Sequence, residues 1–201
     1  SRKFPYPVLL VLLLAAVYVP LILQQADFRT DDYYLLTLLK EHGLPSPFDG
    51  QRYPFFSAFR VVPMFTLLVD HATHGTHALG YYFFNLAVHL AAVLLFFGIL
   101  RLLFRVFFDH EGALLPFLLA LAMGVHADLF YDVVWICNRT EGLLLLFSLA
   151  AVYAWLRYFD GGRIHWYLLG LVSMLLALLS KEQAMHLPLL FLLIGGVFIR
   201  G

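Results

Sequence analysis

Two adjacent carboxylates, Asp31 and Asp32, directly follow the first apolar run of the chain, within the stretch Phe28-Arg29-Thr30-Asp31-Asp32-Tyr33-Tyr34. Acidic side chains at the mouth of a membrane helix are costly to hold close to hydrocarbon, which makes them candidates for function. We interpret the pair as the reactive edge of a membrane enzyme. A second interpretation is compatible with the first. A Thr-Asp-Asp sequence before the periodic run 33–39 is also typical of a helix start, where acids suit the positive end of the helix dipole.

The composition predicts an integral membrane protein. Of 201 residues, 62% are hydrophobic and 13% are charged, and the mean hydropathy is +0.84. An ordinary soluble domain is roughly 45–50% apolar and about 25% charged. The formal net charge is zero and there is no basic tail, so nothing favours nucleic acid as a partner. A single cysteine, Cys137, excludes an internal disulfide and a cysteine-built metal site.

Apolar runs divide the chain into expected membrane segments. A spanning helix needs about 20 predominantly apolar residues. Two of the later runs are short, and they reach that length only if flanking charged residues lie at the interface and face protein or water. We expect an all-α bundle of about six spans forming a single membrane domain over 1–201. The expected spans are 4–26, 78–105, 112–127, 142–157, 164–180 and 183–199.

Six spans place both termini on one side of the membrane. Basic residues exceed acidic ones in the short turns on that side, so the positive-inside rule predicts cytoplasmic termini. The loops 27–77 and 128–141 are then periplasmic or lumenal, and 128–141 is expected to line a cavity. The long first loop should contain a short amphipathic helix over 31–42. A second apolar stretch, 55–69, is interrupted by an arginine and a proline, and the topology beyond it would invert if this stretch crossed the membrane.

Four short motifs occur in a familiar order. A double acid follows the first helix, and an Arg-Tyr-Pro turn at 52–54 lies in the loop. Gly80-Tyr81-Tyr82-Phe83-Phe84-Asn85-Leu86-Ala87-Val88-His89 opens the next helix, and Ser180-Lys181-Glu182-Gln183-Ala184 comes later. Together they resemble the GT-C class of polytopic glycosyltransferases, most closely the branch related to the tetratricopeptide-containing O-mannosyltransferases and their bacterial relatives. The resemblance runs from about Asp27 to Pro188.

The resemblance implies a reaction and a set of roles. The donor would be a polyprenyl-phosphate sugar, and catalysis would occur in the first extracytoplasmic loop. Asp31 or Asp32 would act as general base on an acceptor hydroxyl, which attacks the anomeric carbon with inversion. Cations suited to the donor phosphate are Arg52, Arg139 and Lys181. For each of these three, an interfacial anchor or a salt bridge is an equal alternative.

The segment 126–141 matches the class only in part. The class usually has His-Pro where this chain has His126-Ala127, and the position of its expected Glu holds Tyr131. The nearest acid, Asp132, lies one residue after that position. Asp132, Glu141 and Glu182 are candidate supporting acids.

No metal ligand set is assigned from the sequence. Asp128 and Asp132 would share a face if helical, which would suit a divalent cation such as Mg²⁺ or Mn²⁺. Such a cation needs more oxygen ligands than the sequence provides. The histidines at 71, 74 and 77 are expected in a wet turn rather than a zinc site. Asn85 and His89, one helical turn apart, are expected to make structural hydrogen bonds between helices.

Two alternatives to a complete enzyme stay open. Members of the class are normally longer, and no tetratricopeptide repeat is present here. The chain is either the N-terminal part of a longer protein or a reduced, inactive accessory subunit that packs against a larger membrane complex. The expected partners are lipid, a polyprenyl-phosphate sugar, an acceptor protein or glycan, and other membrane subunits. A transporter is less expected, because the charges cluster on one face and no paired repeats occur.

Overall fold

The computed structural model describes residues 5–24, 27–42, 60–109 and 111–200. Every element in these ranges is helical. The α-helices are α1 (Tyr6–Gln24), α2 (Thr30–His42), α3 (Val61–His74), α4 (Ala78–Phe108), α5 (Leu114–Gly124), α6 (Ala127–Val134), α7 (Arg139–Gly161), α8 (Ile164–Leu178) and α9 (Leu187–Arg200). Two short 3₁₀ helices are η1 (Ile136–Asn138) and η2 (Glu182–His186). The expected all-α class is confirmed, and the short helix expected over 31–42 is α2.

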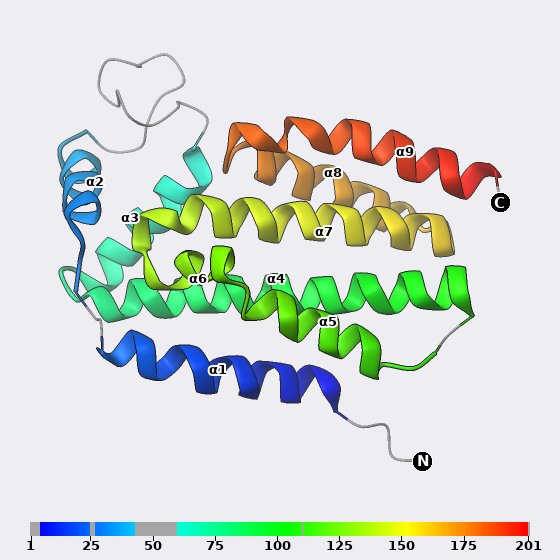
Figure 1. The fold of residues 1–201 in the computed structure, drawn as a ribbon. Coiled ribbons are helices and arrows are strands. Elements are labelled where there is room, and N and C mark those ends of the chain that lie inside the picture. Colours follow the sequence, from blue (N-terminus) through cyan, green and yellow to red (C-terminus); the bar gives the residue numbers. More distant parts are fainter. Residues whose placement is uncertain (1–4, 25–26, 43–59, 110, 201) are drawn as a thin grey trace.

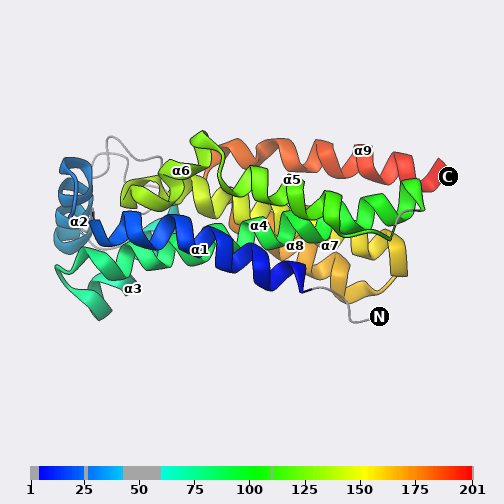
Figure 2. The same cartoon turned by 60° about the horizontal axis from the view of Figure 1, so that its bottom comes forward.

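The helices form a bundle with two distinct ends (Figure 1). Helices α4 and α7 are central, since α4 packs against α1, α3, α5, α6 and α7, while α7 also packs against α8 and α9. We call the end with α2, α3, η1 and η2 the site end. The opposite end holds both chain termini and the turns from α4 to α5 and from α7 to α8, and Figure 2 shows the same arrangement. We call it the terminal end.

The first helix shows why such a sequence folds into a membrane bundle. Its buried residues recur every fourth position, at Leu10, Leu14, Tyr18 and Ile22. Large apolar side chains on its other faces are exposed, including Leu12 and Leu23 at about 60%. Residues four apart share one face of a helix, so α1 packs with a narrow stripe and presents the rest to an apolar solvent.

Among the described residues, three helical segments are long and apolar enough to cross a membrane: Tyr6–Gln24, Ala78–Phe108 and Ile136–Gly161. A fourth candidate is the bent pair Leu114–Gly124 and Ala127–Val134. Helices α8 and α9 are shorter, with 15 and 14 residues. The long apolar helices are consistent with a multi-pass integral membrane protein, and a count of about six spans stays a prediction. Part of the expected loop 128–141 is helical, since α6 and η1 lie in it.

The bend of 62° between α5 and α6 is held by two hydrogen bonds to one carbonyl. A helix end leaves carbonyls without partners. Here the hydroxyl of Tyr18 and the Nε2 of His89 donate to the carbonyl oxygen of Gly124, at 2.8 and 2.9 Å. A Cβ at Gly124 would lie 2.8 Å from Leu14 side-chain atoms, so glycine allows α1 to approach closely. The interhelical hydrogen bond expected of His89 is thus confirmed.

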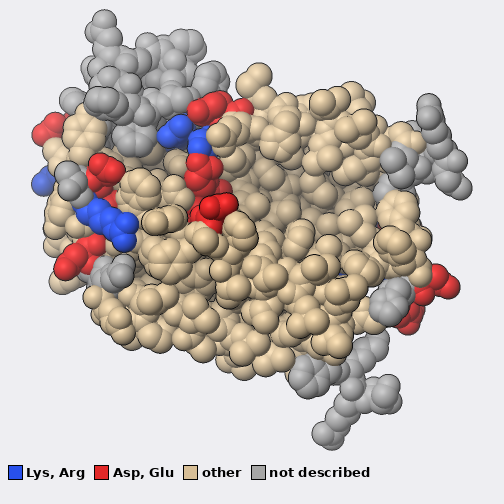
Figure 3. Space-filling model, viewed as in Figure 1, with Lys and Arg blue, Asp and Glu red and all other residues tan. Residues whose placement is uncertain are grey.

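Charged side chains gather at the site end. In Figure 3 they lie mainly over the α2 and α3 side of the visible face, while the middle of that face is almost free of charge. An apolar middle with charged ends is the surface that a bilayer requires.

Candidate active site

The two adjacent acids at the start of α2 have opposite surroundings. Asp32 is 1% exposed, and its two oxygens accept from the backbone N–H groups of Arg29 and Cys137, both at 2.9 Å. The first bond reaches back to the residue before the helix, as the acid of a capping box does. The second fastens α2 to η1. Asp31 is exposed. Asp32 is therefore a structural anchor, and Asp31 is the carboxylate that solvent or substrate can reach.

Arg139, expected to bind phosphate, is enclosed in the protein. Its side chain is 1% exposed, and the guanidinium lies 4.3 Å from the centre of the Phe84 ring. The Nη2 is 2.6 Å from Oδ2 of Asp70, whose side chain is only 6% exposed. Its donors reach the Asn85 Oδ1 at 2.7 Å, the Tyr81 carbonyl at 3.0 Å and the Thr66 hydroxyl at 3.4 Å.

This arrangement explains why an arginine is tolerated beside hydrocarbon. A buried charge is stable only when it is paired and its remaining donors find acceptors. The Nδ2 of Asn85 also donates to the Trp135 carbonyl at 3.2 Å, so the same amide joins α4, α7 and the segment before η1. The structural role expected of Asn85 is confirmed. No donor phosphate can reach the Arg139 guanidinium without displacing these contacts.

Lys181, also expected to bind the donor phosphate, forms one of two ion pairs that lie just after α8. The Lys181 ammonium contacts the Glu141 carboxylate. Nearby, the Arg60 guanidinium lies 3.2 Å from the Glu182 carboxylate. A backbone hydrogen bond from Val62 to the Leu179 carbonyl, at 3.2 Å, holds α3 beside this turn. The pKa of Glu182 is lowered, chiefly by the hydrogen bond from its own backbone N–H; burial opposes this shift, and Arg60 and Lys181 add to it.

A pocket of about 390 Å³ opens beside these residues. Its polar lining includes Asp128, Asp132, Asn138, Glu141 and His186, and leucines of α6 and α7 form its apolar side. Asp132 is buried and accepts a hydrogen bond of 2.6 Å from the Asn138 amide. Since Cys137 is tied to Asp32, the start of α2 is docked onto the segment that forms one edge of this pocket.

A family model described as dolichyl-phosphate-mannose-protein mannosyltransferase matches residues 64–200, about two thirds of the chain. The chain belongs to this mannosyltransferase family. Its resemblance to the GT-C class is thereby confirmed. Comparison with curated proteins and with solved structures gives no match.

The range matched to the mannosyltransferase family covers part of the candidate site. It includes Asp70, Arg139 and the 181–182 pair, whereas Asp31 and Asp32 precede it. Arg52 also precedes it and lies outside the described residues. The structure thus brings Asp132, Glu141 and Lys181 together, and it links Asp32 to the same region through Cys137.

Two residues of this mannosyltransferase family member were missed by the sequence analysis. Asp70 pairs with Arg139, and Arg60 pairs with Glu182. Asp70 is the single acid between positions 55 and 77, so its isolation in an apolar stretch was a usable signal. In the described ranges, no group of three or more His, Cys, Asp or Glu side chains could hold a metal ion. The divalent cation stays a prediction of the sequence alone.

Proposed function

We propose that this chain transfers a sugar, mannose in the first instance, from a polyprenyl-phosphate donor to an acceptor hydroxyl at the site end of the bundle. Membership of the mannosyltransferase family over residues 64–200 carries this proposal. The acids, cations and pocket at the site end support it, because donor and acceptor need a polar site next to the membrane.

Asp31 is the general base of the proposed reaction. Its carboxylate takes the proton of the acceptor hydroxyl while that oxygen bonds to the anomeric carbon and the bond from this carbon to the phosphate oxygen breaks. The product is an inverted glycoside, and the polyprenyl phosphate leaves with the electron pair, so no strong general acid is required. Asp32 positions Asp31, because its two hydrogen bonds fix the first turn of α2.

Lys181 and Arg60 are the proposed contacts of the donor phosphate. Each is partly exposed, at 13% and 19%, and each already faces a carboxylate that a phosphate could replace. Asp132, Glu141 and Asn138 line the adjoining pocket, where carboxylate and amide groups can accept and donate hydrogen bonds to sugar hydroxyls. Arg139 takes no part in phosphate binding in this proposal, since it is enclosed.

The test is a transfer assay with Asp31→Asn. The purified chain is incubated with radiolabelled polyprenyl-phosphate mannose and a serine- and threonine-rich peptide, and labelled peptide is counted. Loss of a general base should lower the rate about 10²–10⁴-fold. The matched control is Asp109→Asn, the same substitution at the terminal end, where asparagine tolerates the positive φ of 48° at that position. Asp109→Asn should transfer at the wild-type rate.

Two results would contradict the proposal. Equal transfer by Asp31→Asn and the wild type would remove Asp31 from the reaction. A wild-type chain that is inactive alone, and that is isolated with stoichiometric membrane subunits, would favour the accessory-subunit alternative.

A further inference from the structure

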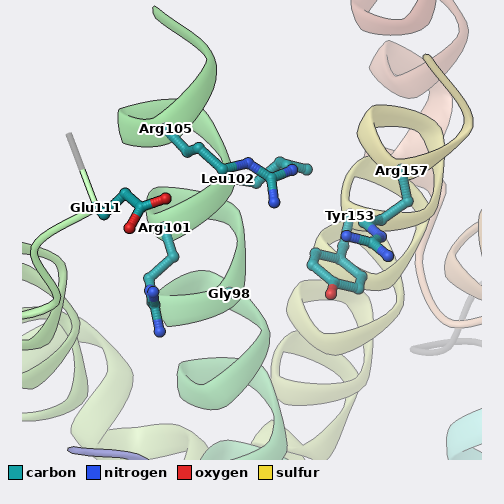
Figure 4. A pocket seen from close by; sticks show the side chains of 7 residues that line it. All are labelled: Gly98, Arg101, Leu102, Arg105, Glu111, Tyr153 and Arg157. Carbon is teal, nitrogen blue, oxygen red and sulfur yellow. The ribbon is translucent and has the colours of Figure 1, made fainter. Parts of the chain in front are cut away.

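A second pocket lies at the terminal end, far from Asp31 and Asp32. It has a volume of about 440 Å³, and it is formed by the final turns of α4, the segment that follows them and the second half of α7. Figure 4 shows Arg101 and Arg105 extending from α4, Arg157 and Tyr153 from α7, and Glu111 beside the two arginines of α4. Neither the reaction proposed above nor its residues involve this pocket.

The pocket carries an excess of positive charge. Arg105 and Arg157 share one carboxylate, with guanidinium nitrogens 2.7 and 3.7 Å from Oδ2 of Asp160. Arg101 is exposed and makes no hydrogen bond or ion pair with the described part of the chain. Glu111 is the one acid in the lining itself. Three guanidinium groups thus face two carboxylates, and Arg101 is the group left to bind an anion.

An aromatic ring and a glycine form one wall of the pocket. Gly98 lies in its lining, and a Cβ there would be 3.3 Å from the ring of Tyr153. The glycine therefore lets the ring come close to α4. Arg157 stacks over Trp166, with its guanidinium carbon 5.3 Å from the ring centre, which fixes the direction of its donors.

The position along α4 places the pocket at the level of lipid headgroups. With a rise of about 1.5 Å per residue, this helix of 31 residues is longer than the hydrocarbon core, which is about 30 Å thick. Arg101 and Arg105 lie in its last turns, followed by Phe107 and Phe108, which are 51% and 72% exposed. Aromatic side chains next to basic ones are typical of the membrane interface. The terminal end is also the end predicted to face the cytoplasm, where anionic lipids are enriched.

We propose that this pocket binds the phosphate of an anionic phospholipid headgroup. Guanidinium groups bind phosphate oxygens with two parallel hydrogen bonds, and Arg101 and Arg157 are placed on opposite helices to do so from two sides. The acyl chains would lie along the exposed apolar residues beside the pocket. Glu111 repels the same phosphate and so weakens the binding.

The experiment measures binding of phosphatidylglycerol to the purified chain in nonionic detergent by native mass spectrometry. Phosphatidylcholine is the lipid control, and inorganic phosphate is added as a competitor. Arg101→Gln should weaken phosphatidylglycerol binding about tenfold, because one charge-assisted phosphate contact is lost. Arg163→Gln is the matched control, an exposed arginine at the same end outside the pocket lining, and it should bind as the wild type does.

Glu111→Gln should tighten binding, an increase that misfolding could not produce. Equal binding of the two lipids, or equal losses in Arg101→Gln and Arg163→Gln, would overturn the proposal. Binding of inorganic phosphate that depends on Arg101, without binding of phosphatidylglycerol, would identify a site for soluble phosphate and would also overturn it. Sugar transfer is not measured in this experiment, so neither proposal depends on the result for the other.

Discussion

Two arginines at opposite ends of the bundle have opposite surroundings. At the site end, Arg139 is 1% exposed and directs its donors to four protein groups. At the terminal end, Arg101 is exposed, and it lines an open pocket without a partner among the described residues. Both residues belong to long, mostly apolar helices. Arg139 is the first residue of α7, Arg101 lies in the last turns of α4, and their partners differ.

This difference separates charges that hold the fold from charges that can bind a ligand. A buried charge with every partner in place specifies how helices meet, and removing one partner leaves the other uncompensated. An exposed charge without a partner adds little to stability and is free to bind. The same contrast holds on a smaller scale for Asp32 and Asp31, where one acid is anchored and its neighbour is open.

The largest effect is expected from Arg139→Leu. This change leaves the Asp70 carboxylate buried without its cation, which should destabilise the chain by about 3–5 kcal/mol. Thermal unfolding in detergent, followed by circular dichroism, measures the loss. The double variant Arg139→Leu/Asp70→Leu should recover part of it, and Arg101→Leu should unfold at the wild-type temperature. If Arg139→Leu and Arg101→Leu proved equally stable, the distinction between the two ends would fail.

A smaller loss is expected from Asp32→Ala. The substitution leaves the backbone N–H groups of Arg29 and Cys137 without their acceptor, at a cost of about 1–3 kcal/mol. Asp31→Ala should cost less, about 0.3–1 kcal/mol at most, from the lost interaction of its carboxylate with the helix dipole. Thermal unfolding again gives both values. A larger loss for Asp31→Ala than for Asp32→Ala would reverse the roles that we assign to this pair.

The sequence was a good guide to elements that depend on local composition. Helix α4 begins at Ala78, where the apolar run was expected to begin, because a long uncharged run and helix formation coincide there. The all-helical class followed from the same property. Residues 55–69, in contrast, had no clear assignment from the sequence. Helix α3, which begins at Val61, lies at the site end beside α2.

The sequence could not assign partners to the charged residues. Asp32 and Cys137 are 105 positions apart, and nothing local to either residue predicts their hydrogen bond. Arg139 had the residue type of a phosphate ligand, and only the packing of α3 against α4 and α7 reveals that Asp70 neutralises it. The bend at Gly124 was missed for a similar reason, since its two hydrogen-bond donors come from α1 and α4.

The smallest effect should come from Glu182→Gln, which breaks a partly exposed ion pair with Arg60. Such pairs contribute about 0–1 kcal/mol. Because the pKa of Glu182 is lowered in the folded chain, its contribution is complete above the ordinary glutamate pKa of about 4.3 and disappears as the pH falls through the lower folded value. Wild type and Glu182→Gln should therefore differ slightly in unfolding temperature near neutral pH and converge in acid.

Glu111→Gln, at the terminal end, is the control. It removes an acid that has no partner among the described residues, so its unfolding temperature should match the wild type at both pH values. A wild type that unfolded at a lower temperature than Glu182→Gln near neutral pH would mean that the charge on Glu182 opposes folding, and the site end would then hold an acid available for binding.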